Sequence, residues 1–248
     1  MYIRTDAVVL RETRYKDADK LLTVLTRSHG LQTVGVRGAM SKGHIWAAST
    51  QLLAYSEMTL FAHKNRMHFK EADLVDAWHP LRSDLTRVSL CHYAAELCGA
   101  VAPEGLESGE LMDLLCLMLK RACYKTQPEY LLKTAFEVAL MRICGYAPYV
   151  RDCGVCGETN PRAPKLLPRE GRLLCACHEQ GAQALPLTEG ALAALRYLLE
   201  CAPTRVFSFT LEGHDLCSLS RASEAYVSAH LERGFATLDF YKKLGVSR

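Results

Sequence analysis

The sequence lacks the motifs that mark common enzyme active sites. It contains no Gly-x-Ser-x-Gly nucleophile elbow, no Gly-x-x-x-x-Gly-Lys-Ser/Thr phosphate loop and no dinucleotide-binding glycine fingerprint. The His-Glu-x-x-His pattern of zinc hydrolases is also absent, and the nine histidines are scattered along the chain. These absences predict a binding protein and not an enzyme.

Long apolar runs are missing as well. The longest, such as residues 114–119, are far too short to cross a bilayer. The opening MYIRTDAVVL has neither the apolar core nor the cleavage site of a signal peptide. We therefore expect a protein of the reducing cytoplasm that does not associate with membranes, in which a bound metal and not disulfides would hold a small module together.

Cysteine, in contrast, is abundant, with eleven residues. Five of them lie in apolar helical patterns, where a free thiol behaves as a small hydrophobic group: Cys91, Cys98, Cys116, Cys123 and Cys144. Another cluster falls in a polar stretch at residues 152–179 that is rich in proline and glycine. This second group has no helical or strand pattern in which to bury its thiols.

The stretch at residues 152–179 has the spacing of a zinc ribbon or knuckle. Cys153 and Cys156 form a Cys-x-x-Cys pair, and Cys175 begins a second group after a spacer that reads as a returning loop. Two such groups complete the tetrahedron that Zn²⁺ prefers. Gly154 and Gly157 follow the first two cysteines, and we expect them to provide positive φ angles in the turn.

The fourth ligand has two candidates. Spacing favours His178, which keeps the two-residue gap after Cys175, while Cys177 would make a tighter Cys-x-Cys pair. The alternatives to a metal site are ordinary buried cysteines or a redox Cys-x-x-Cys, which requires a strand-to-helix setting that is not visible here. A structural zinc is favoured over a catalytic one, because no general base accompanies the cysteines.

The first 78 residues have the pattern of a small β-barrel. Apolar and β-branched runs occur at residues 7–10, 20–26, 32–36, 52–61 and 67–75, separated by short turn signals. Five strands in so short a segment favour an OB-fold. Asp19, just before the second run, is expected to accept hydrogen bonds from backbone amides in a turn.

Charge is distributed unevenly along the chain. The formal net charge is only +3, yet residues 1–70 hold eleven Lys and Arg against five Asp and Glu. A positive barrel is suited to a phosphate backbone. Tyr15 and Trp46, in loop-like sequence, are the preferred stacking residues for unpaired bases, whereas Tyr55, Phe61 and Phe69 are expected in the barrel core. The candidate phosphate contacts are Arg14, Lys16, Lys20, Arg37, Lys42 and Arg66.

Residues 79–248 are expected to form a mainly α-helical domain that contains the metal loop. Helical periodicity begins after a Ser83 cap, resumes after Ser108, and returns from Pro128 to a stop at Gly145. Thr188 caps a further helix, residues 206–211 are expected to be extended, and a final helix is predicted over residues 219–233. The fold class is therefore α+β and multidomain, with a barrel at residues 1–78 followed by helices.

Five segments resemble the RecO family of bacterial DNA repair and recombination mediators. They are TDAVVLRETRYKDADKLLTVLTRSHGL, GVRGAMSKG, FKEADLVDAWHPLRSDLTRVSLCHYAAEL, FEVALMRICGYAPYVRDCGVCGE and EGRLLCACHE. The most specific is the fourth, with Gly-Tyr-x-Pro before Cys-x-x-Cys-Gly. The chain departs from the family pattern at Met40, where a basic residue is common, and in the second ligand group, where the family spacing falls on His178.

The resemblance implies an N-terminal OB-fold, a helical domain and a zinc site. It also implies binding of single- and double-stranded DNA, annealing of complementary strands, and loading of recombinase onto DNA coated by single-stranded-DNA-binding protein. The implied partners are RecR, the C-terminal tail of the single-stranded-DNA-binding protein and, indirectly, RecA, in the bacterial cytoplasm at the nucleoid. The alternative is a zinc-containing scaffold that bridges repair partners and has weak DNA affinity of its own.

Overall fold

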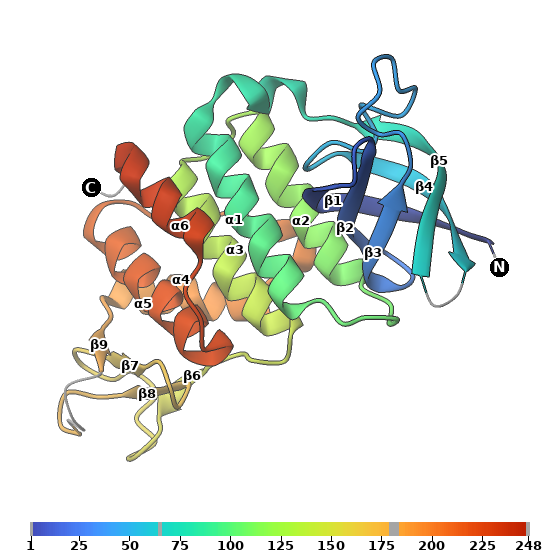
Figure 1. The fold of residues 1–248 in the computed structure, drawn as a ribbon. Helices are drawn as coiled ribbons and strands as arrows, with labels where there is room; N and C mark the ends of the chain where they lie inside the picture. The colour runs from blue at the N-terminus through green and yellow to red at the C-terminus, as the bar shows by residue number, and fades with distance from the viewer. Residues whose placement is uncertain (1, 64–65, 179–183, 247–248) are drawn as a thin grey trace. The chain divides into compact units, whose positions relative to one another are not determined.

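The computed structural model describes residues 2–63, 66–178 and 184–246. Its contacts divide the chain into two compact units (Figure 1). The first unit combines residues 1–124 with residues 237–248, and the second comprises residues 125–236. Among the helices of the described residues, none is both long enough and apolar enough to span a membrane.

A closed five-stranded barrel forms the N-terminal part of the first unit. Its strands are β1 (Tyr2–Tyr15), β2 (Asp19–Thr26), β3 (Gly30–Val36), β4 (Tyr55–His63) and β5 (Arg66–Asp76). They follow the order β1-β2-β3-β5-β4, with β4 returning to β1. All neighbours are antiparallel except β3 and β5, whose parallel seam consists of the pairs Val34–Met67 and Gly35–His68. The predicted OB-like barrel is confirmed.

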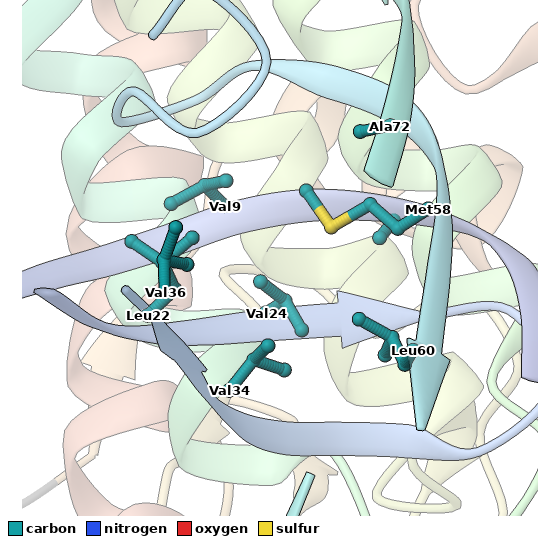
Figure 2. Close-up of a cluster of buried hydrophobic side chains, with 9 residues drawn as sticks. Val9, Leu22, Val24, Val34, Val36, Met58, Leu60 and Ala72 are labelled. Atoms are coloured by element: carbon teal, nitrogen blue, oxygen red, sulfur yellow. The ribbon is translucent and has the colours of Figure 1, made fainter. Parts of the chain in front are cut away.

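Alternating side chains fill the interior of the barrel. Val9, Leu22, Val24, Val34, Val36, Met58, Leu60 and Ala72 converge on one buried cluster (Figure 2). Because successive strand residues point to opposite faces, the intervening positions of β2 and β3 face outward. The exposed distal part of β1 is polar, which is why its apolar run predicted a much shorter strand.

Two consecutive helices pack on the barrel within the first unit. A 3₁₀ turn (His79–Ser83) leads into α1 (Leu85–Val101), and α2 (Gly109–Cys123) follows. The predicted Ser83 cap was wrong by one position: the Asp84 carboxylate accepts the Arg87 backbone N–H at 3.1 Å. The short α6 (Ala236–Tyr241) returns to this unit, where the Glu96 carboxylate accepts hydrogen bonds from Thr237, and a π-helical turn (Lys242–Val246) follows it.

Arg27 ties the β2–β3 turn to α2. Its guanidinium lies 2.5 Å from Asp113 and 3.3 Å from Asp6. The hydrogen bond to Asp113, opposed by partial burial and supported by the charges of Asp113 and Asp6, raises the pKa of Arg27. This arginine is therefore committed to an internal contact, so the basic count of the barrel overstates the charge available to a ligand.

In the residues that the structure describes, the second unit contains three α-helices and a small sheet. The helices are α3 (Glu129–Ile143), α4 (Glu189–Glu200) and α5 (Gly213–Leu231), with a 3₁₀ turn at Pro203–Arg205. The sheet has the order β6-β8-β7-β9, with β6 (Tyr149–Cys153), β7 (Lys165–Leu167), β8 (Arg172–Leu174) and β9 (Leu185–Pro186). Strands β7 and β8 form a hairpin, and β6 adds to β8 in parallel.

A buried ionic network joins α3 to α5 in the second unit. Lys133 lies 2.9 Å from Glu137 and 3.2 Å from Glu224. Ser223 donates to Glu137 at 2.6 Å, so the buried carboxylate is also hydrogen-bonded. Burial opposes the charge on Lys133, but the two carboxylates outweigh it and raise the lysine pKa. The buried lysine is therefore paired with carboxylates, which offsets the cost of removing its charge from water.

Two predictions about the later part of the chain were wrong. Residues 206–211 were expected to be extended, but Val206 has helical backbone angles and lies with Phe207 in a turn after the 3₁₀ helix. Helix α5 begins at Gly213, six residues before the predicted start. The domain boundary expected after residue 78 stays a prediction. The two compact units show which segments pack together, and they do not show which segments fold independently.

Candidate metal centre and nucleic-acid surface

The structure brings three cysteines and one histidine together at the small sheet. Their ligand atoms, from Cys153, Cys156, Cys175 and His178, all lie within 4.8 Å of one another. Cys153 ends β6 and Cys175 directly follows β8, so the parallel pairing of these strands places both sulfurs at the same end of the sheet. Each cysteine begins a tight turn that returns the second ligand of its pair.

Each of those turns is closed by a backbone hydrogen bond. Gly157 N–H donates to the Cys153 carbonyl at 2.9 Å, and His178 N–H donates to the Cys175 carbonyl at 3.1 Å. Gly157 has φ of 74°, as its position in the turn requires. The prediction for Gly154 was wrong, because it has no positive φ. It is small because β8 approaches closely: an added Cβ would lie 3.0 Å from the Arg172 side chain.

The spacing of the ligand atoms fits a tetrahedral metal ion. The Sγ atoms of Cys156 and Cys175 are 3.7 Å apart, and His178 Nδ1 lies 3.9 Å from Cys153 Sγ and 2.9 Å from Cys175 Sγ. Tetrahedral zinc with ordinary Zn–S and Zn–N bonds separates such atoms by about 3.5 to 3.8 Å, which is close to the first two separations, while the contact between Cys175 and His178 is shorter. The donor set of three sulfurs and one imidazole nitrogen is also one that zinc uses. The residues present therefore fit the metal.

The backbone around Cys153 favours the thiolate that a metal requires. Burial of this side chain raises its pKa, but hydrogen bonds from the backbone amides of Cys156, Val155 and Cys175 outweigh burial and lower the pKa to about 6. The Cys175 N–H lies 3.3 Å from the Cys153 sulfur. Because thiolates and not thiols bind metals, the site is prepared for a cation.

An arginine that sequence reasoning missed holds the first ligand pair against α4. Arg196 donates from Nε to the Val150 carbonyl at 2.9 Å. Its Nη2 donates to the carbonyls of Arg151 at 2.9 Å and Thr159 at 2.8 Å. One guanidinium thus fixes the strand before Cys153 and the loop after Cys156. The only sequence signal was an arginine on an amphipathic helix, which is usually a surface residue.

The alternative fourth ligand is not part of the cluster. Cys177 is exposed, and its sulfur is outside the group formed by the other four side chains. All eleven cysteines are free thiols, so no disulfide competes for the cluster. The last residue of the predicted loop, Glu179, lies outside the described residues. The assignment of Cys153, Cys156, Cys175 and His178 as metal ligands stays a prediction that this geometry supports.

A separate groove lies on the outer face of the barrel. Its volume is about 760 Å³, and its floor includes outward-facing positions of β2, β3 and β5, such as Leu21, Gly35 and His68. Ligands of OB-folds bind on the face formed by the second and third strands. Its cationic lining residues are Lys16, Lys20 and Arg37, and Asp19 and Glu104 also line it.

The structure divides the six candidate phosphate contacts. Arg14 and Lys42 are exposed but do not line the groove, although Arg14 is the cross-strand partner of Lys20. Arg66 is on β5, and its side chain lies outside what the structure describes. Lys20 makes an ion pair with Glu12 at 2.8 Å. Their roles as DNA contacts stay predictions, with the two candidates Lys16 and Arg37 the best placed.

Asp19 orders one wall of this groove. Its carboxylate accepts the Gly38 backbone N–H at 2.9 Å, so it does stabilise a turn, although this turn follows β3 and is not the one just before β2. The acid therefore fixes the turn that follows Arg37, in addition to contributing charge. Gly38 has φ of 64°, so the turn depends on a glycine there.

The aromatic residues are arranged differently from the sequence interpretation. Trp46 packs against the barrel core and contacts Phe69 edge to face, with ring centroids 5.4 Å apart. Phe61, expected in the core, lies outside the core cluster and stacks on His68 at 5.1 Å. The exposure of Tyr15 and its position on the groove are consistent with the earlier interpretation. Phe61 points outward because it is the neighbour of the buried Leu60 on the same strand. Which residues of a strand point inward depends on its pairing register, which the composition of the strand does not give.

Barrel and cluster together define a class of protein: an OB-like barrel with a cationic groove, linked to helices that carry a potential metal site. Comparison with known families identifies both parts. Residues 1–78 match the model of the Recombination protein O N terminal, and residues 82–239 match that of the Recombination protein O C terminal. The chain belongs to the RecO family.

Related proteins match nearly the whole chain. DNA repair protein RecO of Symbiobacterium thermophilum is 32% identical over 249 residues, covering 98% of each chain. DNA repair protein RecO of Acetivibrio thermocellus is 29% identical over 245 residues, covering 98% of this chain and 97% of the relative. That of Heliobacterium modesticaldum is 33% identical over 208 residues, covering 81% of this chain and 74% of the relative.

Proposed function

We propose that this protein is a non-enzymatic mediator of DNA repair and recombination. It binds single- and double-stranded DNA on the barrel and anneals complementary strands. The observation that carries the proposal is the groove on the oligonucleotide-binding face of an OB-like barrel, lined by Lys16, Lys20 and Arg37. Membership of the RecO family and the names of the relatives, each a DNA repair protein, support it.

Charge neutralisation is the physical mechanism of annealing in this proposal. Two single strands repel each other through their phosphates, and a cationic surface that holds the backbones lowers this cost. Bases on a strand held through its phosphates keep their pairing edges free. Because association releases counterions, binding depends steeply on salt.

The partners in this proposal follow from the family. The protein acts with RecR and with the C-terminal tail of the single-stranded-DNA-binding protein, and it assists loading of RecA-type recombinase onto coated DNA. It works in the bacterial cytoplasm at the nucleoid. The proposed cofactor is one structural Zn²⁺ held by Cys153, Cys156, Cys175 and His178, whose geometry supports this assignment. When bound, the ion would hold β6 and β8 together through their following turns.

A paired substitution tests the proposal on the full-length protein. Replacing Lys16 and Arg37 by glutamine removes two groove charges but keeps a polar, unbranched side chain, although a shorter one. We expect affinity for a single-stranded oligonucleotide, measured by fluorescence anisotropy at low salt, to fall at least about tenfold, and strand annealing to slow with it. Lys120→Gln/Arg169→Gln is the matched control, because both residues are exposed and neither lines the groove.

One observation favours a second function, a zinc-containing scaffold with weak DNA affinity. The groove's Lys20 is already paired with Glu12, and Asp19 and Glu104 line the same surface. The test is the annealing rate of Lys16→Gln/Arg37→Gln. If this variant anneals DNA at the wild-type rate and still binds RecR and single-stranded-DNA-binding protein, the scaffold function is supported and annealing through this groove is refuted.

A further inference from the structure

A row of outward-facing residues crosses four strands of the barrel and ends in the groove. Tyr2 pairs with Phe61 across β1 and β4, and Phe61 pairs with His68 across β4 and β5. His68 then pairs with Gly35 across the parallel seam. Because direct cross-strand partners share a face, these residues form one continuous line on the outside of the barrel.

The first three members of this row form an aromatic surface. The ring centroids of Tyr2 and Phe61 are 6.0 Å apart, and those of Phe61 and His68 are 5.1 Å apart at an interplanar angle of 26°. None of these rings belongs to the buried core, and Tyr2 is 65% exposed. The Lys70 ammonium lies 4.8 Å from the centre of the Tyr2 ring. Contiguous rings that are exposed at Tyr2 and half-buried at Phe61 and His68, with a cation beside them, have the composition of a base-stacking surface.

Gly35 leaves a hollow where this row meets the groove. An added Cβ would lie 3.7 Å from His68 Nδ1 and 3.9 Å from Leu21 Cδ2, so the position is flanked by an aromatic ring and an aliphatic side chain. The φ angle of Gly35 is not positive, and the backbone therefore does not require glycine here. A glycine inside a strand is found at bulges, at tight bends and where a ligand or another backbone approaches closely.

We propose that the hollow over Gly35 receives an unpaired base of single-stranded DNA. The base lies between His68 and Leu21, with Phe61 supporting the His68 ring, while Lys16 and Arg37 hold the adjacent phosphates. This inference rests on the proposed function and adds to it a preference for single-stranded over double-stranded DNA. A base inside a duplex has both faces stacked on its neighbours and cannot enter. The hollow therefore favours single strands, whereas the groove cations serve both forms.

Two substitutions in the full-length protein test the hollow. Gly35→Val fills it with a residue that suits a strand, and Phe61→Ala removes the support of His68. The probe is a single-stranded oligonucleotide with one 2-aminopurine, whose fluorescence is quenched when it stacks. We expect quenching on wild-type binding and its loss in both variants, with about tenfold weaker single-strand affinity and unchanged duplex affinity. Phe240→Ala, an exposed aromatic on α6, is the matched control.

Thermal unfolding of each variant shows whether the barrel is intact, and only folded variants are compared. Wild-type quenching and affinity in both variants overturn the inference, as does an equal loss of single-strand and duplex affinity. If these outcomes occur while Lys16→Gln/Arg37→Gln still weakens binding, the proposed function stands and the hollow alone is refuted. If wild-type protein binds no DNA, the proposed function fails and the hollow fails with it.

Discussion

Gly30 shows how closely single residues are fitted in the first unit. It begins β3 with φ of 59°, beside the loop between α1 and α2. The Leu31 N–H donates to the Pro103 carbonyl at 2.9 Å, and the Gly105 N–H donates to the His29 carbonyl at 3.0 Å. A Cβ on Gly30 would lie 2.0 Å from the Pro103 oxygen. The positive φ disfavours any other residue, and the contact with Pro103 leaves no room for a Cβ unless the loop shifts.

We therefore expect Gly30→Ala to lower the free energy of unfolding by at least about 2 to 3 kcal/mol, measured by urea denaturation. Gly43→Ala is the control, because Gly43 has φ of 75° and no atom within 4 Å of the added Cβ. That variant should lose only the backbone term, about 1 to 2 kcal/mol. Equal losses in the two variants would show that the loop yields without cost.

Predictability at the residue scale depended on whether the signal was local. An acid before a strand indicated that Asp19 would accept an amide in a turn, but the amide it accepts, from Gly38, lies in the turn after β3 and could not be identified from local sequence. The α1 cap was misplaced by one residue, since Ser83 and Asp84 both suit the position and only geometry separates them. Gly154 and Phe61 were misjudged, because a close approach by β8 and an outward strand position both depend on partners distant in sequence.

The small sheet of the second unit is an element that a metal would stabilise. It has only short strands, and its apolar support is the cluster of Cys153, Leu167, Leu174 and Cys175. Two turns return Cys156 and His178 to the same point, so one ion would link both strands. Structural zinc is worth on the order of 10 to 16 kcal/mol in small finger peptides, which form no packed core without it.

Cys153→Ser should remove the metal and lower the thermal stability of the second unit. Metal analysis of purified protein should give about one zinc per chain for the wild type and almost none for the variant. Cys177→Ser is the matched control, because it removes an exposed thiol outside the cluster and should keep the metal. Zinc loss in Cys177→Ser with retention in His178→Ala would instead make Cys177 the fourth ligand.

Elements were predicted better than their pairing. Alternating apolar residues indicated five strands, and the Cys-x-x-Cys spacing indicated where ligands gather, because both signals are local. The two-pair parallel seam between β3 and β5 leaves no local signal, although it closes the barrel and forms part of the groove. The apolar side chains of residues 206–211 suggested an extended segment, but Val206 and Phe207 are buried in a turn.

At the scale of the whole molecule, the net charge of the barrel does not show which basic side chains can bind a ligand, because some of them form ion pairs within the protein. Arg4 forms an ion pair with Glu57 at 2.6 Å, and Arg27 is held by Asp6 and Asp113. These two cations contribute to the positive count of the barrel but stabilise its own surface. The sum over the sequence indicated a nucleic-acid partner, while the structure shows which of these cations are held in ion pairs, Lys20 of the groove among them.

Salt dependence measures how many of these cations contact phosphates. Each phosphate contact to a single strand adds about 0.7 to the slope of log affinity against log salt concentration. We expect Lys16→Gln/Arg37→Gln to reduce that slope by about 1 to 1.5. Gly35→Val should weaken single-strand binding but keep the wild-type slope, because it removes stacking and no charge. An unchanged slope in the double variant would place the phosphate contacts elsewhere.

The return of α6 to the first unit has a consequence for synthesis on the ribosome. Leu238 and Tyr241 of α6 are buried, and Thr237 contacts Glu96 of α1. The chain that separates α6 from α2 is the whole second unit, residues 125–236. The barrel and its first two helices therefore emerge well before the helix that completes their unit. Until translation reaches α6, the Glu96 carboxylate of α1 that accepts from Thr237 is open to solvent and to chaperones.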